Sequence, residues 1–175
     1  MDRLNALDEQ DAAAALLACC ASRRWAAEVA AARPYPDLAA LKAASARAML
    51  GLTWEDVGEA LAAHPRIGER AGGASREAAW SRREQAGASD AGLETQQALA
   101  DGNRAYEERF GHVYLICATG LSAAEMLAAL HRRLDNGVAA ERVVVREELA
   151  KIVDLRLAGL AAELDGAGAA AGEAR

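Results

Sequence analysis

His64 is the residue of this chain best placed to do chemistry. It stands before a proline in the run His64-Pro65-Arg66-Ile67-Gly68-Glu69. Because a proline disfavours helical backbone at the residue before it, we expect His64 at the end of a helix, ahead of a glycine-containing loop. Histidines more often cap or pack than react, but an imidazole exchanges protons near neutral pH. Its position at a loop favours a proton donor or acceptor.

Ser81, Glu84 and Gln85 form the second polar group. On a helix the spacing i, i+3, i+4 places three side chains on one face. A solvated surface gives the same pattern, so the spacing alone leaves a charged outer face as the alternative. If Glu84 lies near His64, its carboxylate favours the protonated imidazole. Together the two segments predict a small acid/base site that needs neither metal nor cofactor.

Other reactive arrangements lack the residues they need. His112 and His131 show no metal-ligand spacing with His64, so we expect no metal. The chain has no phosphate-binding glycine loop and no nucleophile elbow. Cys117 has apolar neighbours, which predicts a buried thiol of low reactivity.

The charge and composition of the chain limit which kinds of partner it is expected to bind. The chain has 175 residues and a formal net charge of −6, and its basic residues form no uncompensated stripe. This balance argues against a nucleic-acid partner. Charges interrupt every long apolar run, so we expect no membrane span. The first residues lack the layout of a secretion signal, which suggests a cytoplasmic protein.

The elements that position these residues are expected to be helices. Alanine favours helix, and several Ser, Thr or Asp residues stand where a helix cap is needed. We predict an all-α fold of seven or eight helices in one compact domain, residues 1–165, followed by a flexible Gly/Ala-rich tail, residues 166–175. The expected helices cover residues 8–20, 22–32, 37–50, 53–63, 75–86, 89–109, 122–134 and 139–164.

Five motifs, taken in order, resemble one family. They are His64-Pro65-Arg66-Ile67-Gly68-Glu69, Ser81-x-x-Glu84-Gln85, Asn103-x-x-Tyr106-x-x-Arg109-Phe110-Gly111, Ile116-Cys117-Ala118 and Lys151-Ile152-x-x-Leu155-Arg156-Leu157. Over roughly residues 5–160 the chain is similar to the 2-oxo-4-hydroxy-4-carboxy-5-ureidoimidazoline (OHCU) decarboxylases of urate breakdown. The resemblance implies an all-helical, cofactor-free carboxy-lyase, commonly a homodimer, that converts the small molecule OHCU to (S)-allantoin.

Roles follow from the resemblance position by position. It implies that His64 is the catalytic acid/base and that Glu84 is its charged partner. The apolar run from Tyr114 to Ala118 is implied to form a wall that offers backbone amides to the substrate ring. The implied substrate-binding residues are Pro65, Ser81, Gln85, Tyr114, Leu115, Ile116, Cys117, Ala118 and Arg156. The chain departs from the family at His112-Val113, where an aromatic-proline pair is frequent, and at Tyr114, which replaces a frequent phenylalanine.

Two alternatives stay open at this point. One is a non-catalytic helical interaction module that uses the last predicted helix as its binding surface, although the apolar stripe of that helix suits a core or dimer interface better. The other keeps the lyase fold but changes the substrate to another ureido or carboxylated ring.

Overall fold

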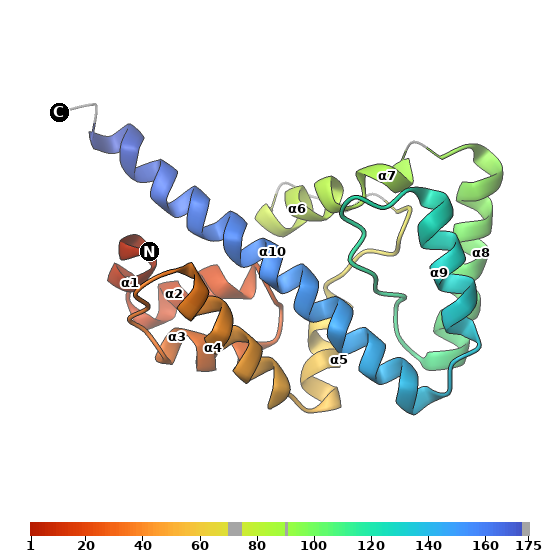
Figure 1. Ribbon diagram of the computed structural model, residues 1–175, viewed down its shortest axis with the longest axis horizontal. Coiled ribbons are helices and arrows are strands. Elements are labelled where there is room, and N and C mark those ends of the chain that lie inside the picture. Colours follow the sequence, from red (N-terminus) through yellow and green to blue (C-terminus); the bar gives the residue numbers. More distant parts are fainter. Residues whose placement is uncertain (70–74, 90, 173–175) are drawn as a thin grey trace. The chain divides into compact units, whose positions relative to one another are not determined.

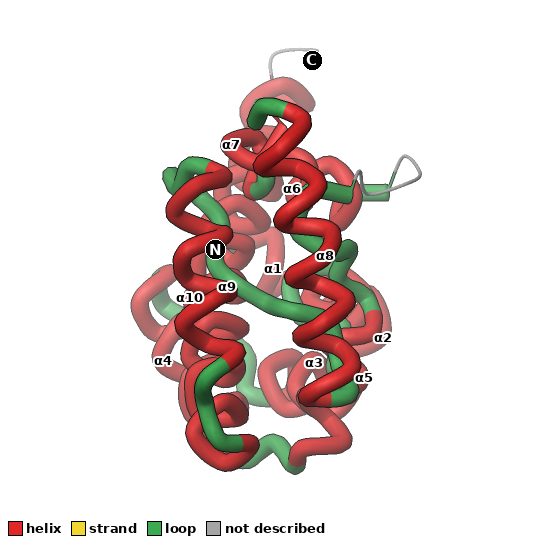
Figure 2. Tube along the Cα trace, turned by 90° about the vertical axis from the view of Figure 1, so that its right-hand side faces the viewer, coloured by secondary structure: helices red, strands yellow, loops and turns green. Residues whose placement is uncertain are grey.

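The computed structural model describes residues 1–69, 75–89 and 91–172, and this part of the chain is helical without strands (Figures 1 and 2). The predicted all-α class is confirmed. Among the described residues, eight helices have nine or more residues, and two shorter ones were not predicted. The helices are α1 (Asp2–Ala6), α2 (Glu9–Leu17), α3 (Arg23–Ala31), α4 (Leu38–Leu50), α5 (Trp54–Ala62), α6 (Arg76–Glu84), α7 (Ala86–Ser89), α8 (Leu93–Phe110), α9 (Ala123–Leu134) and α10 (Val138–Gly172).

Capping side chains start most of the predicted helices. In each case a side-chain oxygen accepts a hydrogen bond from a backbone N–H of the first turn, which otherwise has no partner within the helix. At α9 the capping box is complete, because Glu125 also accepts from the backbone N–H of Ser122. The capping residues are Asp8, Ser22, Asp37, Ser75 and Ser122.

Several predicted boundaries were wrong. The long helix expected from Ser89 starts at Leu93, because extended backbone at Gly92 separates it from α7. The helix expected to reach Cys20 ends at Leu17. The last helix continues past its predicted end to Gly172, since alanine-rich sequence sustains helix without a stop signal. Residues 173–175 of the predicted tail lie outside the described residues.

Contacts divide the chain into two compact units, residues 1–59 with 150–175 and residues 60–149. In the first unit α2 packs on α3 and α3 packs on α4. Trp25, Leu16 and Leu41 are completely buried there. Lys42 of α4 pairs with Asp154 of α10 at 2.6 Å, which fastens α10 to this unit.

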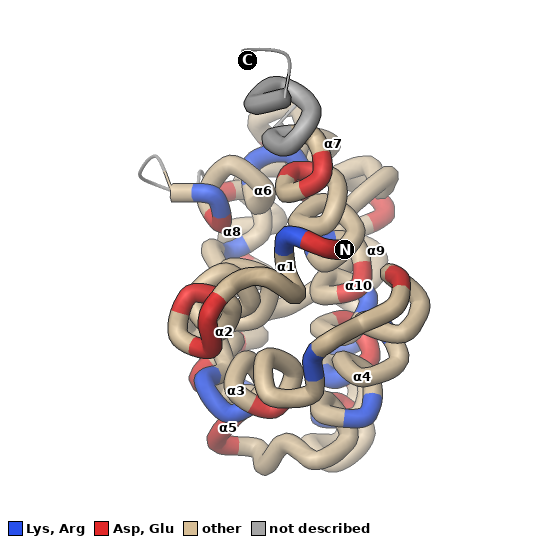
Figure 3. The backbone as a smooth tube through the Cα atoms, turned by 90° about the vertical axis from the view of Figure 1, so that its left-hand side faces the viewer, with Lys and Arg blue, Asp and Glu red and all other residues tan. Residues whose placement is uncertain are grey.

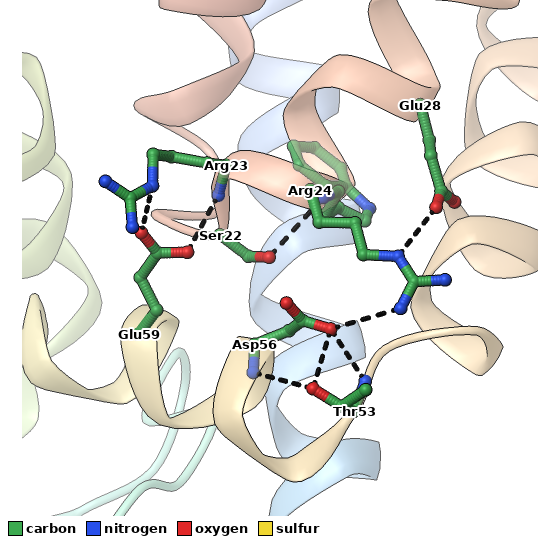
Figure 4. Close-up of polar contacts among 8 residues, drawn as sticks. Ser22, Arg23, Arg24, Glu28, Thr53, Asp56 and Glu59 are labelled. Carbon is green, nitrogen blue, oxygen red and sulfur yellow. Dashed lines mark hydrogen bonds and ion pairs between the residues drawn. The ribbon is translucent and has the colours of Figure 1, made fainter.

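Polar contacts join α3 to the start of α5 within the first unit (Figure 4). Arg24 contacts Glu28 at 2.9 Å and Asp56 at 3.4 Å. Asp56 also accepts hydrogen bonds from the backbone N–H and the hydroxyl of Thr53, both at 2.8 Å. The Thr53 N–H bond is the largest of the effects that lower the pKa of Asp56.

In the second unit α8 packs on α9. Its core contains the buried side chains of Leu99, Tyr106, Met126 and Leu130. The two helices approach closely at Gly102, where a Cβ atom would lie only 2.4 Å from a methyl carbon of Leu130. Packing of this pair therefore depends on glycine at that position.

Charged residues are spread over the helices. In Figure 3 acidic positions lie at the start of α2, and basic positions lie on α3 and α4. Within the described ranges, no helix has the length and apolarity needed to span a membrane.

Candidate active site

His64 follows α5, where its backbone N–H donates to the carbonyl of Leu61 at 3.0 Å. Its Nδ1 lies 2.8 Å from the carbonyl oxygen of Ala60. A carbonyl only accepts hydrogen bonds, so Nδ1 carries the proton in this contact. In the neutral ring the lone pair is then on Nε2, which is buried. The contact with Ala60 thus sets the tautomer and the orientation of the ring.

A hydrogen bond links the histidine loop to the Ser81–Gln85 segment. The backbone N–H of Gly68 donates to Oε1 of Gln85 at 3.1 Å. Gly68 has a φ of 88°, a conformation that favours glycine. The two motifs that the sequence singled out therefore lie side by side within the second unit.

Ser81, Glu84 and Gln85 occupy the last turn and the C-cap of α6. Ser81 is 5% exposed, and Glu84 and Gln85 are half-buried. The alternative of a solvated face is wrong for Ser81, which points into the protein. Arg82 and Arg83 are exposed, as their offset on the helix predicts. Pro65 is half-buried beside the histidine.

The predicted wall is a non-helical segment, residues 114–118, between α8 and α9. Its side chains Tyr114, Leu115, Ile116 and Ala118 are buried. Burial raises the pKa of Tyr114 to about 12, so its hydroxyl stays protonated and donates to the carbonyl of Met126 at 3.3 Å. The segment is apolar, as predicted, and it forms part of the core of the second unit.

Cys117 differs from prediction in two ways. Its thiol is half-buried rather than buried. Its backbone N–H, expected to face a substrate ring, donates to a carboxylate oxygen of Glu148 at 2.7 Å. That amide is therefore occupied by the protein itself, and any backbone contact to a ligand must use another position in the wall.

A buried network of Arg133, Glu141 and Tyr106 contacts the wall. Nη1 of Arg133 donates to the carbonyl of Leu115 at 2.6 Å, and its guanidinium lies 4.8 Å from the centre of the Tyr114 ring. The same guanidinium contacts Glu141 at 2.6 Å. Tyr106 also donates to Glu141, and burial followed by this hydrogen bond raises the pKa of the phenol.

Arg156 lies on α10 in the first unit and is 5% exposed. Its charge acts on Cys20, whose pKa rises to about 11 because burial outweighs the stabilisation of the thiolate by Ser22 and Arg156. A buried guanidinium is suited to holding an anionic oxygen.

The family model described as OHCU decarboxylase matches residues 5–158. The chain belongs to the OHCU decarboxylase family. The family predicted from the five motifs is confirmed, and with it the enzyme class, a decarboxylase. Membership leaves the non-catalytic interaction module without support.

Two curated relatives show how far the likeness extends. The 2-oxo-4-hydroxy-4-carboxy-5-ureidoimidazoline decarboxylase of Haloferax volcanii is 30% identical over 90% of this chain and 94% of its own length. The uric acid degradation bifunctional protein TTL of Arabidopsis thaliana is 33% identical over 81% of this chain. The match spans 45% of that plant protein's length.

Solved structures agree with the fold. A crystal structure of an OHCU decarboxylase in the presence of (S)-allantoin matches with a TM-score of 0.74 and 28% identity, over 88% of this chain and 98% of that one. A crystal structure of an (S)-allantoin synthase matches with a TM-score of 0.67 and 19% identity, over 91% of this chain and 53% of that one, which shows the fold alone.

Sequence reasoning missed three residues that support the decarboxylase motifs. Glu148 binds the Cys117 amide, Arg133 binds the Leu115 carbonyl, and Asn103 donates to the carbonyl of Ile67 at 2.8 Å. Asn103 belongs to a recognised motif, but no role followed from its type. Arg133 ends a run of three basic residues that reads as a solvated helix end. These contacts join residues far apart in the sequence, so only the folded structure shows them.

Proposed function

We propose that this chain decarboxylates OHCU to (S)-allantoin, with His64 as the acid/base and Glu84 as its charged partner. The carrying observation is the bond from Nδ1 of His64 to the Ala60 carbonyl, which orients the imidazole and places the lone pair of the neutral ring on Nε2. The hydrogen bond between Gly68 and Gln85 supports the pairing, because it brings the histidine loop to the helix that carries Glu84.

The reaction needs little from the protein beyond proton transfer. Its ring carbon bears a hydroxyl and a carboxylate, and the bond to the carboxylate breaks as carbon dioxide leaves. The bonding electron pair stays on the ring, where neighbouring carbonyl or imine groups delocalise it. The ring nitrogen that receives the electron pair takes up a proton, the hydroxyl loses one, and a ring carbon gains one on a single face, which sets the handedness of the product. The reaction therefore consumes one proton net, taken from solvent. Acid/base help of this kind contributes roughly 10²- to 10⁴-fold to the rate.

The remaining residues bind and orient the substrate. Arg156 holds an anionic or carbonyl oxygen by paired hydrogen bonds, as a guanidinium does for planar oxyanions. Ser81 and Gln85 offer hydrogen bonds, and Pro65 fixes the backbone next to the imidazole. The apolar wall from Tyr114 to Ala118 excludes water and strengthens the charge interactions. Its amide contacts exclude that of Cys117, which Glu148 occupies.

A coupled optical assay tests the activity. Uricase and hydroxyisourate hydrolase generate the unstable substrate in place, and circular dichroism follows the chiral product. The purified chain should speed the appearance of (S)-allantoin over the uncatalysed reaction. Unchanged rate and handedness would overturn the proposed function, and a panel of other ureido or carboxylated rings would then show whether a different substrate is used.

Two variants test the roles of His64 and Glu84. His64→Ala should abolish activity while helical content is kept, and Glu84→Gln should lower kcat by removing the charge beside the imidazole. His131→Ala is the matched control, because His131 is an exposed histidine on α9. A His64→Ala protein with substantial activity would remove the imidazole from the mechanism.

A further inference from the structure

Asn103 on α8 has a buried amide of which only one atom is hydrogen-bonded among the described residues. Its side chain is 1% exposed, and Nδ2 donates to the carbonyl oxygen of Ile67 at 2.8 Å. Its Oδ1 is also buried and has no hydrogen-bond partner among the described residues. A buried acceptor without a partner opposes folding, and such groups in a native protein need an explanation.

The hydrogen bond from Nδ2 to Ile67 explains why a buried asparagine is kept at this position. Ile67 is the centre of the segment that runs from His64 to Glu69, and its side chain is buried in the core of the second unit. The other contacts of this segment are closer to the surface: Arg66 pairs with Glu107 at 2.6 Å, and Gly68 donates to Gln85. Asn103 therefore provides the buried hydrogen bond that holds this segment, at Ile67, three residues after His64.

We propose that Asn103 is a positioning residue, which sets the placement of His64 and Pro65 through the Ile67 carbonyl. The inference rests on the proposed function, because it takes His64 as the acid/base. One end of the segment is fixed by the bonds from His64 to Ala60 and Leu61, and Asn103 fixes its middle at Ile67. A segment held at these two points keeps the imidazole in one geometry, and small displacements of a reacting group are costly to the rate.

A ligand for the amide is the competing explanation, and the geometry disfavours it. Asn103 lines a cleft of about 160 Å³ with Arg66, Gly68 and Gln96 among its other walls. Its Oδ1, however, has essentially no accessible surface. A molecule in the cleft does not reach the acceptor that lacks a partner, so the cleft does not account for the asparagine.

Asn103→Leu gives the first test, since leucine keeps the branched shape and cannot donate. It removes the acceptor without a partner and leaves the Ile67 carbonyl without its donor, so the thermal midpoint should stay close to that of the wild type. The kcat should fall on the order of ten- to a hundredfold. Leu99→Ala is the matched control, one turn earlier and equally buried on α8. It should lower the midpoint and keep kcat at temperatures where it is folded.

Asn103→Asp gives the second test through pH. A protonated aspartic acid can donate its O–H to the Ile67 carbonyl, whereas the carboxylate only accepts. The activity of this variant relative to the wild type should rise as the pH is lowered, because protonation restores a donor. A purely structural asparagine predicts a ratio that does not change with pH once folding is allowed for.

A readout without turnover separates this proposal from the proposed function. The ¹⁵N chemical shifts of the imidazoles report the tautomer, and His64→Ala assigns the signal among the three histidines. Asn103→Leu should shift the His64 signals, and Leu99→Ala should leave them unchanged. A wild-type kcat and wild-type His64 shifts in folded Asn103→Leu would overturn the positioning role. Absence of (S)-allantoin formation by the wild type would overturn the proposed function and not the shift prediction.

Discussion

The carboxylate of Glu141 is completely buried and neutralises Arg133 behind the wall. Asn136 donates to its second oxygen at 2.7 Å. Glu141→Ala leaves the buried guanidinium without this partner, so the free energy of unfolding should fall by about 3–5 kcal/mol. Urea denaturation measures this change.

The companion variant checks the cause of that loss. Arg133→Met/Glu141→Leu removes both charges of this pair, so much of the stability should return. A Glu141→Ala protein as stable as the wild type would show that the pair is not buried in solution.

Glu107 gives a pH-dependent prediction. Its bond from Arg66 lowers the pKa of Glu107 below the ordinary value of 4.5. A carboxylate with a depressed folded-state pKa stabilises the protein above the unfolded value, and this contribution is lost as the pH falls through the folded value. The difference in thermal midpoint between the wild type and Glu107→Gln should therefore shrink between pH 5 and pH 3. A constant difference across this range would contradict the ion pair.

Residue types and spacings in the sequence predicted only part of the candidate site. His64 and the Ser81 group were found because a proline and a helical spacing mark them locally. Glu148 and Arg133 were not, because each meets its partner across a long stretch of sequence. The same reason explains the wrong expectation for the Cys117 amide: the occupant of a backbone N–H is a tertiary contact that local pattern does not contain.

At the scale of elements, two helix glycines form a natural pair for a packing test. A Cβ at Gly102 would meet Leu130 at 2.4 Å, whereas a Cβ at Gly58 in α5 meets nothing within 4 Å. Gly102→Ala should destabilise the protein by roughly 1–3 kcal/mol, because it overpacks the α8–α9 contact. Gly58→Ala should stabilise it by about 0.5–1 kcal/mol, because alanine favours helix.

Chemical denaturation of both variants measures these changes. A Gly102→Ala protein as stable as the wild type would show that the α8–α9 approach is less close than the structure has it. Destabilisation by Gly58→Ala would contradict the open space around that position.

Helix starts were predictable where a side chain makes them. Asp37 and Ser122 bond to the first turn of their own helices, so the signal lies within four residues. The start of α8 was misplaced because Gly92 carries no capping side chain, and Ser89 offered a false one. The end of α10 was misplaced because an alanine-rich tail holds no clear stop.

At the scale of the whole molecule, the family match covers residues 5–158 and so includes most of both units. The motifs follow the same distribution: the histidine loop and the wall belong to the second unit, and Arg156 belongs to the first. The homodimer implied by the motif resemblance stays a prediction, which analytical ultracentrifugation of the purified chain would measure.

Ligand binding can be measured through global stability, since a molecule that binds only the folded state raises the unfolding free energy. (S)-Allantoin at about 100 times its Kd should add about 2.7 kcal/mol and raise the thermal midpoint. If Arg156 binds the ligand as proposed, Arg156→Gln should lose most of this shift. Arg142→Gln is the control, an exposed arginine on the same helix, and should keep the shift. Equal shifts in both variants would remove Arg156 from the binding site while leaving the decarboxylase family assignment untouched.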